Sequence, residues 1–134
     1  MPYVDDIYLG NPNLKKANTE IEFTQEQILE FVKCKDDPVY FAKKYIKIVS
    51  LDEGLVPFDL YPFQEKLIRN FHEERFNICK MPRQTGKSTT CVSYLLHYAL
   101  FNDNVNIAVL ANKASTARDL LGRLQLAYEN LPKW

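Results

Sequence analysis

The stretch Pro82-Arg83-Gln84-Thr85-Gly86-Lys87-Ser88-Thr89 decides the expected fold of this chain. It contains the Gly-Lys-Ser half of a Walker A loop, whose full pattern is G-x-x-x-x-G-K-[ST], and Met81 stands at the first glycine position. Gly86 permits backbone torsions that bring amides close to phosphate oxygens. Lys87 can reach the β- and γ-phosphates, and the Ser88 hydroxyl can ligate Mg²⁺. The pattern therefore predicts a site for ATP and Mg²⁺.

The residues on either side of this loop predict the structure around it. Residues 76–80 are a short strand candidate, 88–101 an apolar helix expected to be buried on most sides, and 105–111 a nearly continuous apolar strand. Ser115 is expected to cap a last helix that ends at Pro132. This order is a βαβ unit, which implies an α/β fold with a parallel sheet. The context favours a P-loop NTPase over an ordinary polar turn with a solvated lysine.

The chain is expected to have three parts: an extended arm or linker at 1–22, helices and a hairpin at 23–74, and the first part of a P-loop ATPase core at 75–134. Thr24 and Gln27 fit a capping box at the start of one helix, and Pro38 and Pro62 fit the first turns of two more. The β-prone runs 46–51 and 55–58 predict a hairpin.

Several polar residues near these elements are candidates for function. Arg83 is either an arginine finger that stabilises charge on the γ-phosphoryl group or a surface arginine paired with a carboxylate. The Gln64 amide offers a donor and an acceptor that suit the adenine edge; the alternative is a solvent-facing helix glutamine, and the nearby phosphate loop favours adenine. Tyr61 or Phe63 is a candidate to stack on the base, although aromatic residues are more often core. Lys113 is either a DNA contact or a solvated loop lysine.

Asp52-Glu53 mimics the acidic end of a Walker B strand. It precedes the phosphate loop, whereas the Walker B strand follows it, and Gly54 favours a hairpin turn. The dipeptide is therefore interpreted as part of a turn. His72 and His97 have no metal-like partners in the sequence and receive no role.

Composition narrows the class of protein. The 134 residues are 46% hydrophobic and 25% charged, with 17 basic and 17 acidic side chains. A zero net charge argues against coating of nucleic acid by bulk charge but leaves a local basic groove open. The three cysteines lack metal-ligand spacing, and no apolar run approaches the roughly 20 residues of a membrane helix. The chain is expected to be soluble and intracellular.

These residues resemble the large terminase subunit of tailed bacteriophages, the DNA-packaging ATPase, particularly that of myoviruses. The likeness covers nearly the whole chain, and its most specific part is Arg83-Gln84-Thr85-Gly86-Lys87-Ser88-Thr89, which lacks the first glycine. The other matching stretches are residues 10–18, Lys35-Asp36-Asp37-Pro38-Val39-Tyr40-Phe41-Ala42, Tyr61-Pro62-Phe63-Gln64, and Leu110-Ala111-Asn112-Lys113-Ala114-Ser115.

The resemblance implies a RecA-like ATPase that drives double-stranded DNA into a procapsid. It implies Gln64 at adenine, Arg83, Gln84, Thr85, Gly86, Lys87, Ser88 and Thr89 at the nucleotide, Ser88 at Mg²⁺, and Arg83 and Lys87 in catalysis. The implied partners are DNA, the portal protein, the small terminase subunit and further copies in a ring. The implied location is the cytoplasm of the infected bacterium and, transiently, the portal vertex.

The family's Walker B acids, coupling motif and nuclease are expected beyond Trp134. We therefore expect this chain alone to hydrolyse ATP weakly or not at all. Two alternatives stay open. One is a DNA translocase of helicase superfamily 2, which shares the upstream glutamine. The other is a split or degenerate product that binds a partner without catalysis.

Overall fold

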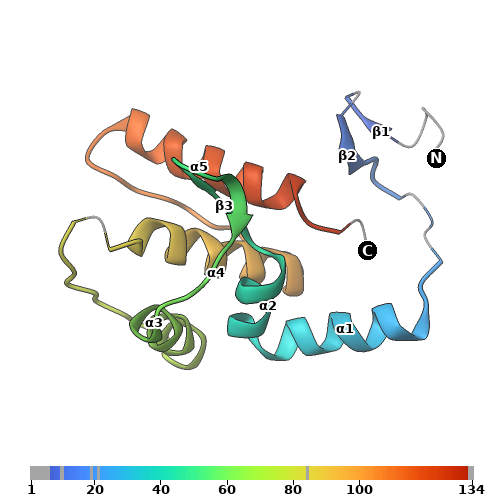
Figure 1. Ribbon diagram of the computed structural model, residues 1–134, viewed down its shortest axis with the longest axis horizontal. Coiled ribbons are helices and arrows are strands. Elements are labelled where there is room, and N and C mark those ends of the chain that lie inside the picture. The colour runs from blue at the N-terminus through green and yellow to red at the C-terminus, as the bar shows by residue number, and fades with distance from the viewer. Residues whose placement is uncertain (1–6, 10, 19, 21, 84, 133–134) are drawn as a thin grey trace.

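The computed structural model describes residues 7–9, 11–18, 20, 22–83 and 85–132, which form a small mixed α/β structure (Figure 1). Its helices are α1 (Gln25–Asp36), α2 (Pro38–Tyr45), α3 (Pro62–Glu73), α4 (Lys87–Phe101) and α5 (Ala114–Glu129). Its strands form two antiparallel pairs, β1 (Ile7–Tyr8) with β2 (Asn11–Lys15) and β3 (Lys47–Ser50) with β4 (Gly54–Pro57). Among the described residues, no helix combines the length and the apolar character needed to cross a membrane.

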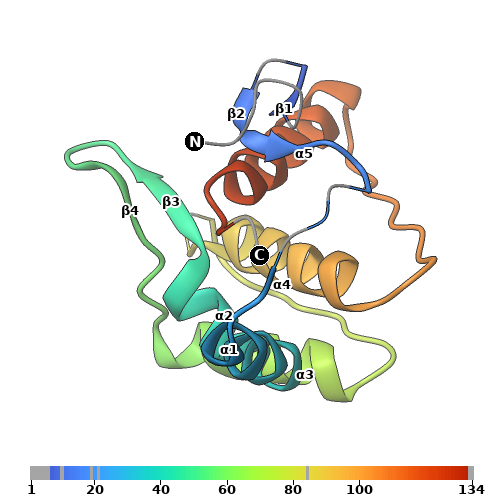
Figure 2. The ribbon, with the colours of Figure 1, turned by 90° about the vertical axis from the view of Figure 1, so that its right-hand side faces the viewer.

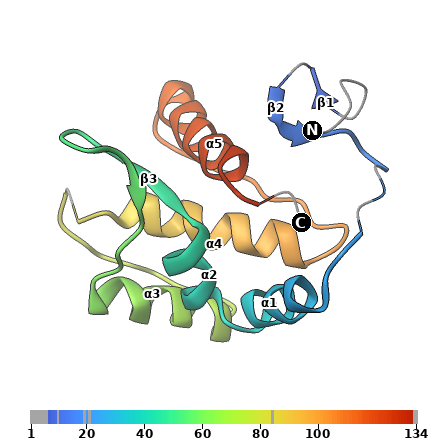
Figure 3. The same cartoon turned by 45° about the vertical axis from the view of Figure 1, so that its right-hand side comes forward.

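Helix α4 occupies the middle of the molecule. Figures 2 and 3 show α5 on one side of it and α1, α2 and α3 on the other, with the β3–β4 ribbon projecting beside them. The main hydrophobic cluster lies between these layers. Its buried members are Cys34, Val39, Phe41, Ala42, Ile46, Phe58, Leu60, Ile68, Leu96 and Ala127.

The predicted starts of the first two helices are confirmed. The Thr24 hydroxyl accepts from the Gln27 amide at 3.2 Å, and the Gln27 side chain accepts from the Thr24 amide at 3.0 Å, which completes the capping box. Asp37 Oδ1 accepts from the Val39 and Tyr40 amides, with Pro38 in the first turn. These contacts join residues two or three positions apart, so the local sequence was enough to predict them.

The predicted hairpin is also confirmed. Lys47 pairs with Pro57 at one end of β3–β4 and Ser50 with Gly54 at the other. Gly54 has φ 76°, in the left-handed region that glycine adopts without strain. Asp52 and Glu53 lie exposed in the turn, as expected of turn residues rather than a Walker B site.

The predicted parallel sheet is absent from the described residues. Segments 76–80 and 105–111 are irregular, and neither makes a backbone–backbone hydrogen bond there. Ile78 is fully exposed and Leu110 is 88% exposed. A strand exists only where a neighbouring strand pairs with it, and an apolar pattern in one segment carries no information about that neighbour.

Three smaller expectations need correction. Ile7–Tyr8 and Asn11–Lys15 of the expected arm pair as β1 and β2. Helix α4 is not buried on most sides: Val92 and Leu96 are buried, whereas Tyr98 and Leu100 are exposed. Helix α5 begins at Ala114 after Lys113 and has no side-chain cap, so Ser115 lies inside the helix.

Candidate phosphate-binding loop

The end of the loop is built around Gly86, directly before α4. Gly86 has φ 72° and ψ 19°, which a residue with a Cβ adopts only with strain. Its carbonyl accepts from the amide of Thr90 at 2.9 Å and from the Thr90 hydroxyl at 2.8 Å. Thr90 is fully buried, so the turn into the helix is anchored in the protein interior.

Lys87 and Ser88 form the first turn of α4. The amides of a first helical turn have no partner within the helix and, with the helix dipole, favour an anion at this end. The exposed Lys87 folds back, and its Nζ donates to the Met81 carbonyl at 3.5 Å. Thr85 braces the same turn, because its hydroxyl donates to the Pro82 carbonyl at 3.0 Å. The long lysine bond is weak, so an anion can replace it at small cost.

Gln64, from the first turn of α3, lies against this loop. It is 3% exposed. Its Nε2 donates to the Thr85 carbonyl at 3.3 Å, and its Oε1 accepts from the Tyr61 amide at 2.9 Å. A Cβ on Gly86 would lie 2.6 Å from Nε2, which is closer than real Cβ contacts. The structure therefore brings Gln64 to the loop, with its amide bonded to protein groups.

Tyr61 and Phe63 stand beside Gln64 at the start of α3. Their rings are stacked, with centroids 5.8 Å apart and planes 6° apart. They are 65% and 45% exposed, so the core interpretation of these aromatics is wrong. An exposed pair of parallel rings near a phosphate loop is suited to stack on a flat base.

The other residues predicted to contact the nucleotide, Arg83, Gln84 and Thr89, do not share one environment. Arg83 is exposed and has no carboxylate partner among the described residues, since the ion pairs found there join Lys43 to Glu65 and Lys44 to Glu30. Thr89 is half-buried and lines a cavity with residues of β3 and α5. Gln84 lies outside the described residues.

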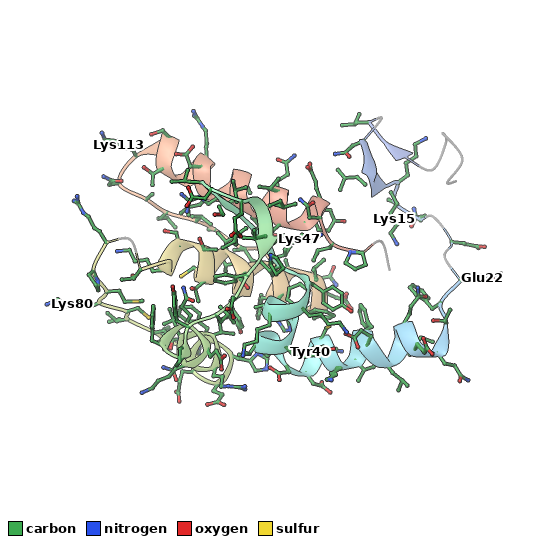
Figure 4. The ribbon with its side chains drawn as sticks, in the orientation of Figure 1. Lys15, Glu22, Tyr40, Lys47, Lys80 and Lys113 are labelled. Carbon is green, nitrogen blue, oxygen red and sulfur yellow. The ribbon has the colours of Figure 1, made fainter. Side chains whose placement is uncertain are left out.

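Positive charge gathers in this half of the chain. Residues 75–118 hold six of the 17 basic side chains but one of the 17 acidic ones, Asp103. Figure 4 shows Lys80 and Lys113 at the same end of the molecule, on either side of α4. Lys80 was not singled out from the sequence. The absence of acidic residues between Arg75 and Asn102 was the signal that would have found it.

A cavity of about 300 Å³ lies on the inner side of the loop, between α3, α4 and α5. Lys87 and Ser88 border it, but its other walls are aliphatic, thioether or thiol side chains, so it is not itself an anion site. Cys79 and Met81 face it from one irregular segment and Val109 faces it from the other. The two segments predicted as strands thus border one apolar space.

No family model matches the chain. Within the described ranges, no group of three His, Cys, Asp or Glu side chains is placed to hold a metal ion. Ser88 offers one hydroxyl oxygen in the first turn of α4, and Mg²⁺ in nucleotide sites keeps several waters and takes other oxygens from the phosphates.

Proposed function

We propose that this chain binds the triphosphate of ATP at residues 82–89 and is the ATP-binding part of a DNA-packaging motor of the large terminase type. The observation that carries the proposal is the left-handed Gly86 directly before a fifteen-residue helix that opens with Lys87. A helix N-terminus, a lysine side chain and a glycine that permits a left-handed turn therefore lie together. These are the features by which phosphate loops bind anions.

The residues would divide the work as follows. The first-turn amides of α4 would receive the phosphate oxygens, and Lys87 would leave the Met81 carbonyl to neutralise the β- and γ-phosphates. Ser88 would hold Mg²⁺, which supplies charge neutralisation at the phosphates. The exposed Arg83 is free of carboxylates among the described residues and can turn toward the γ-phosphoryl group.

The wider function extends beyond the described fold. We propose that segments 76–80 and 105–111 become parallel strands of a RecA-like sheet when further strands cover the apolar cavity that they border. DNA, the portal protein, the small terminase subunit and further copies of the chain would be partners of that completed motor. Alone, the chain is expected to hydrolyse ATP weakly or not at all, because residues 75–102, around the loop, contain no Asp or Glu to hold the metal or activate water.

The exposed apolar segments favour a second candidate, a chain that only binds another polypeptide. Ile78 and Leu110 are largely exposed, and their segments have unpaired backbone groups among the described residues. Such segments pair readily with another strand. Nucleotide binding separates the two candidates, because a pure partner-binding chain needs no functional phosphate loop.

The test is equilibrium binding of ATP with Mg²⁺ by calorimetry. Lys87→Ala should weaken binding about 10- to 100-fold, the scale of a lost charge-assisted contact. Lys113→Ala is the matched control, since it removes an exposed lysine from the same end of the molecule without touching the loop. It should leave affinity within about twofold. Wild-type chain that binds no nucleotide, or equal losses in both variants, would reject the proposal.

A further inference from the structure

The Gln64 amide faces the loop rather than an open base pocket. At 3% exposure it has no free face for the edge of a planar base. Its donor side is engaged by Thr85 and its acceptor side by Tyr61. Reading adenine would require the amide to release both contacts and turn outward, which breaks two part-buried hydrogen bonds, to the Thr85 carbonyl and from the Tyr61 amide.

The Gln64 side chain lies close to two adjacent residues of the loop, Thr85 and Gly86. Nε2 holds the Thr85 carbonyl and occupies the space where a Cβ on Gly86 would be. These are the residues immediately before Lys87, so their orientation sets the direction in which the loop backbone and the first turn of α4 face. The bond to Gln64 fixes the direction of the Thr85 carbonyl, whose negative end would repel phosphate oxygens if it turned toward them.

We propose that Gln64 is a positioning residue that keeps the phosphate loop in its anion-binding shape and thereby sets the affinity for the triphosphate whichever base it carries. This deepens the proposed function and rests on it. Base recognition then falls to the exposed Tyr61–Phe63 pair, which binds flat bases by stacking and discriminates weakly between purines.

The experiment compares ATP, GTP and inorganic tripolyphosphate, each with Mg²⁺, on the whole chain. Gln64→Met keeps the length of the side chain, is neutral and removes the amide. Affinity for all three ligands should fall by the same factor, about tenfold. Gln64→Asn, whose amide is too short to reach Thr85, should give the same pattern and serves if the methionine variant folds poorly.

The matched control is Gln27→Met. Gln27 occupies the same position in α1 and caps Thr24 as Gln64 caps Tyr61, but it lies away from the loop. It should lose the capping contribution to thermal stability with no change in affinity for any of the three ligands. A general loss of helix capping therefore cannot account for the Gln64 result.

The outcomes separate the two proposals. A loss confined to ATP would overturn the inference and assign the amide to adenine. A folded Gln64 variant with unchanged affinity for all three ligands would overturn it as well, since the amide would then only cap α3. Failure of the wild-type chain to bind any of the three would reject the proposed function itself, together with the role of Gln64 in it.

Discussion

Residues 24–74, before the loop, and residues 75–132 differ in how much of the buried cluster they supply and in how their helices begin. Eight of the ten buried members of the main hydrophobic cluster come from residues 34–68. All three helices of the first part have a polar cap contact at their start, made by Thr24, Asp37 and Gln64. In the second part, α4 and α5 begin without a side-chain cap, and Ile78 and Leu110 face outward.

This difference shows where most of the buried core originates. The first part caps the starts of its helices and supplies most of the buried cluster, although some of its apolar side chains, such as Leu29 and Leu51, are exposed. The second part leaves two kinds of surface open among its described residues: helix amides and lysines that suit an anion, and apolar segments that suit another strand. Incomplete surfaces of this kind are where binding is expected.

The comparison can be tested most strongly by removing one aliphatic side chain from each part. Ile68, in the first part, is fully buried, so Ile68→Ala should lower the free energy of unfolding by about 2–5 kcal/mol. Leu110→Ala, in the second part, should change it by less than about 0.5 kcal/mol, because the side chain is already in water. Urea unfolding followed by circular dichroism measures both. Equal losses would mean that segment 105–111 is covered in solution and the comparison fails.

A medium effect is expected at the junction of the two parts. His97, on α4, is 2% exposed, and its Nε2 lies 2.8 Å from the Cys34 carbonyl of α1, while Nδ1 has no partner among the described residues. Burial lowers the pKa of His97, so the folded chain binds fewer protons than the unfolded chain. The free energy of unfolding should be fully developed above about pH 6.5 and fall as pH drops below it.

The slope from this histidine is limited to about 1.4 kcal/mol per pH unit, the value for one proton. Urea unfolding between pH 5 and 8 should show it in the wild type and, slightly reduced, in His72→Gln, which keeps His97 but removes one of the smaller causes of its lowered pKa. His97→Phe should flatten the profile. A profile that stays as steep in His97→Phe would show that another group couples the two parts.

The smallest effect is expected inside the first part, where Glu30 joins α1 to α2. Glu30 accepts hydrogen bonds from Lys44, Tyr40 and Tyr45, and those from Lys44 and Tyr40 contribute most to lowering its pKa to about 2. Because the folded pKa is lowered, this stabilisation is present above about pH 4.5 and is lost as pH falls toward 2. Water screens the pair, so the effect is modest.

Acid titration of the folded state, followed by near-ultraviolet circular dichroism between pH 5 and 2, checks this contact. Glu30→Gln should be less stable than the wild type near neutral pH and show a flatter decline in this range. Glu26→Gln, on the first turn of the same helix, is the control and should follow the wild-type curve. Identical curves for all three proteins would show that the contact carries no net stability.

Sequence reasoning succeeded where the cause was local. Three correct predictions involve residues a few positions apart: the capping box at Thr24, the place of Pro38 in the first turn of α2, and the hairpin turn at Gly54. The left-handed Gly86 before α4 belongs to the same class, because the turn and the helix start are adjacent in the chain. The permissive glycine and the helix after it were therefore predictable from neighbours in sequence, while the phosphate loop and its binding of ATP stay a prediction.

Contacts between distant residues were decided by the folded chain. Gln64 and Thr85 could both be matched to motifs in the sequence. The hydrogen bond between them, which turns the Gln64 amide inward, depends on how α3 packs against α4. The apolar pattern of 105–111 suits a strand, yet pairing and covering layers determine whether one forms, and none is supplied by the described residues. Local backbone preferences are properties of neighbours in sequence, whereas burial and pairing are properties of neighbours in space.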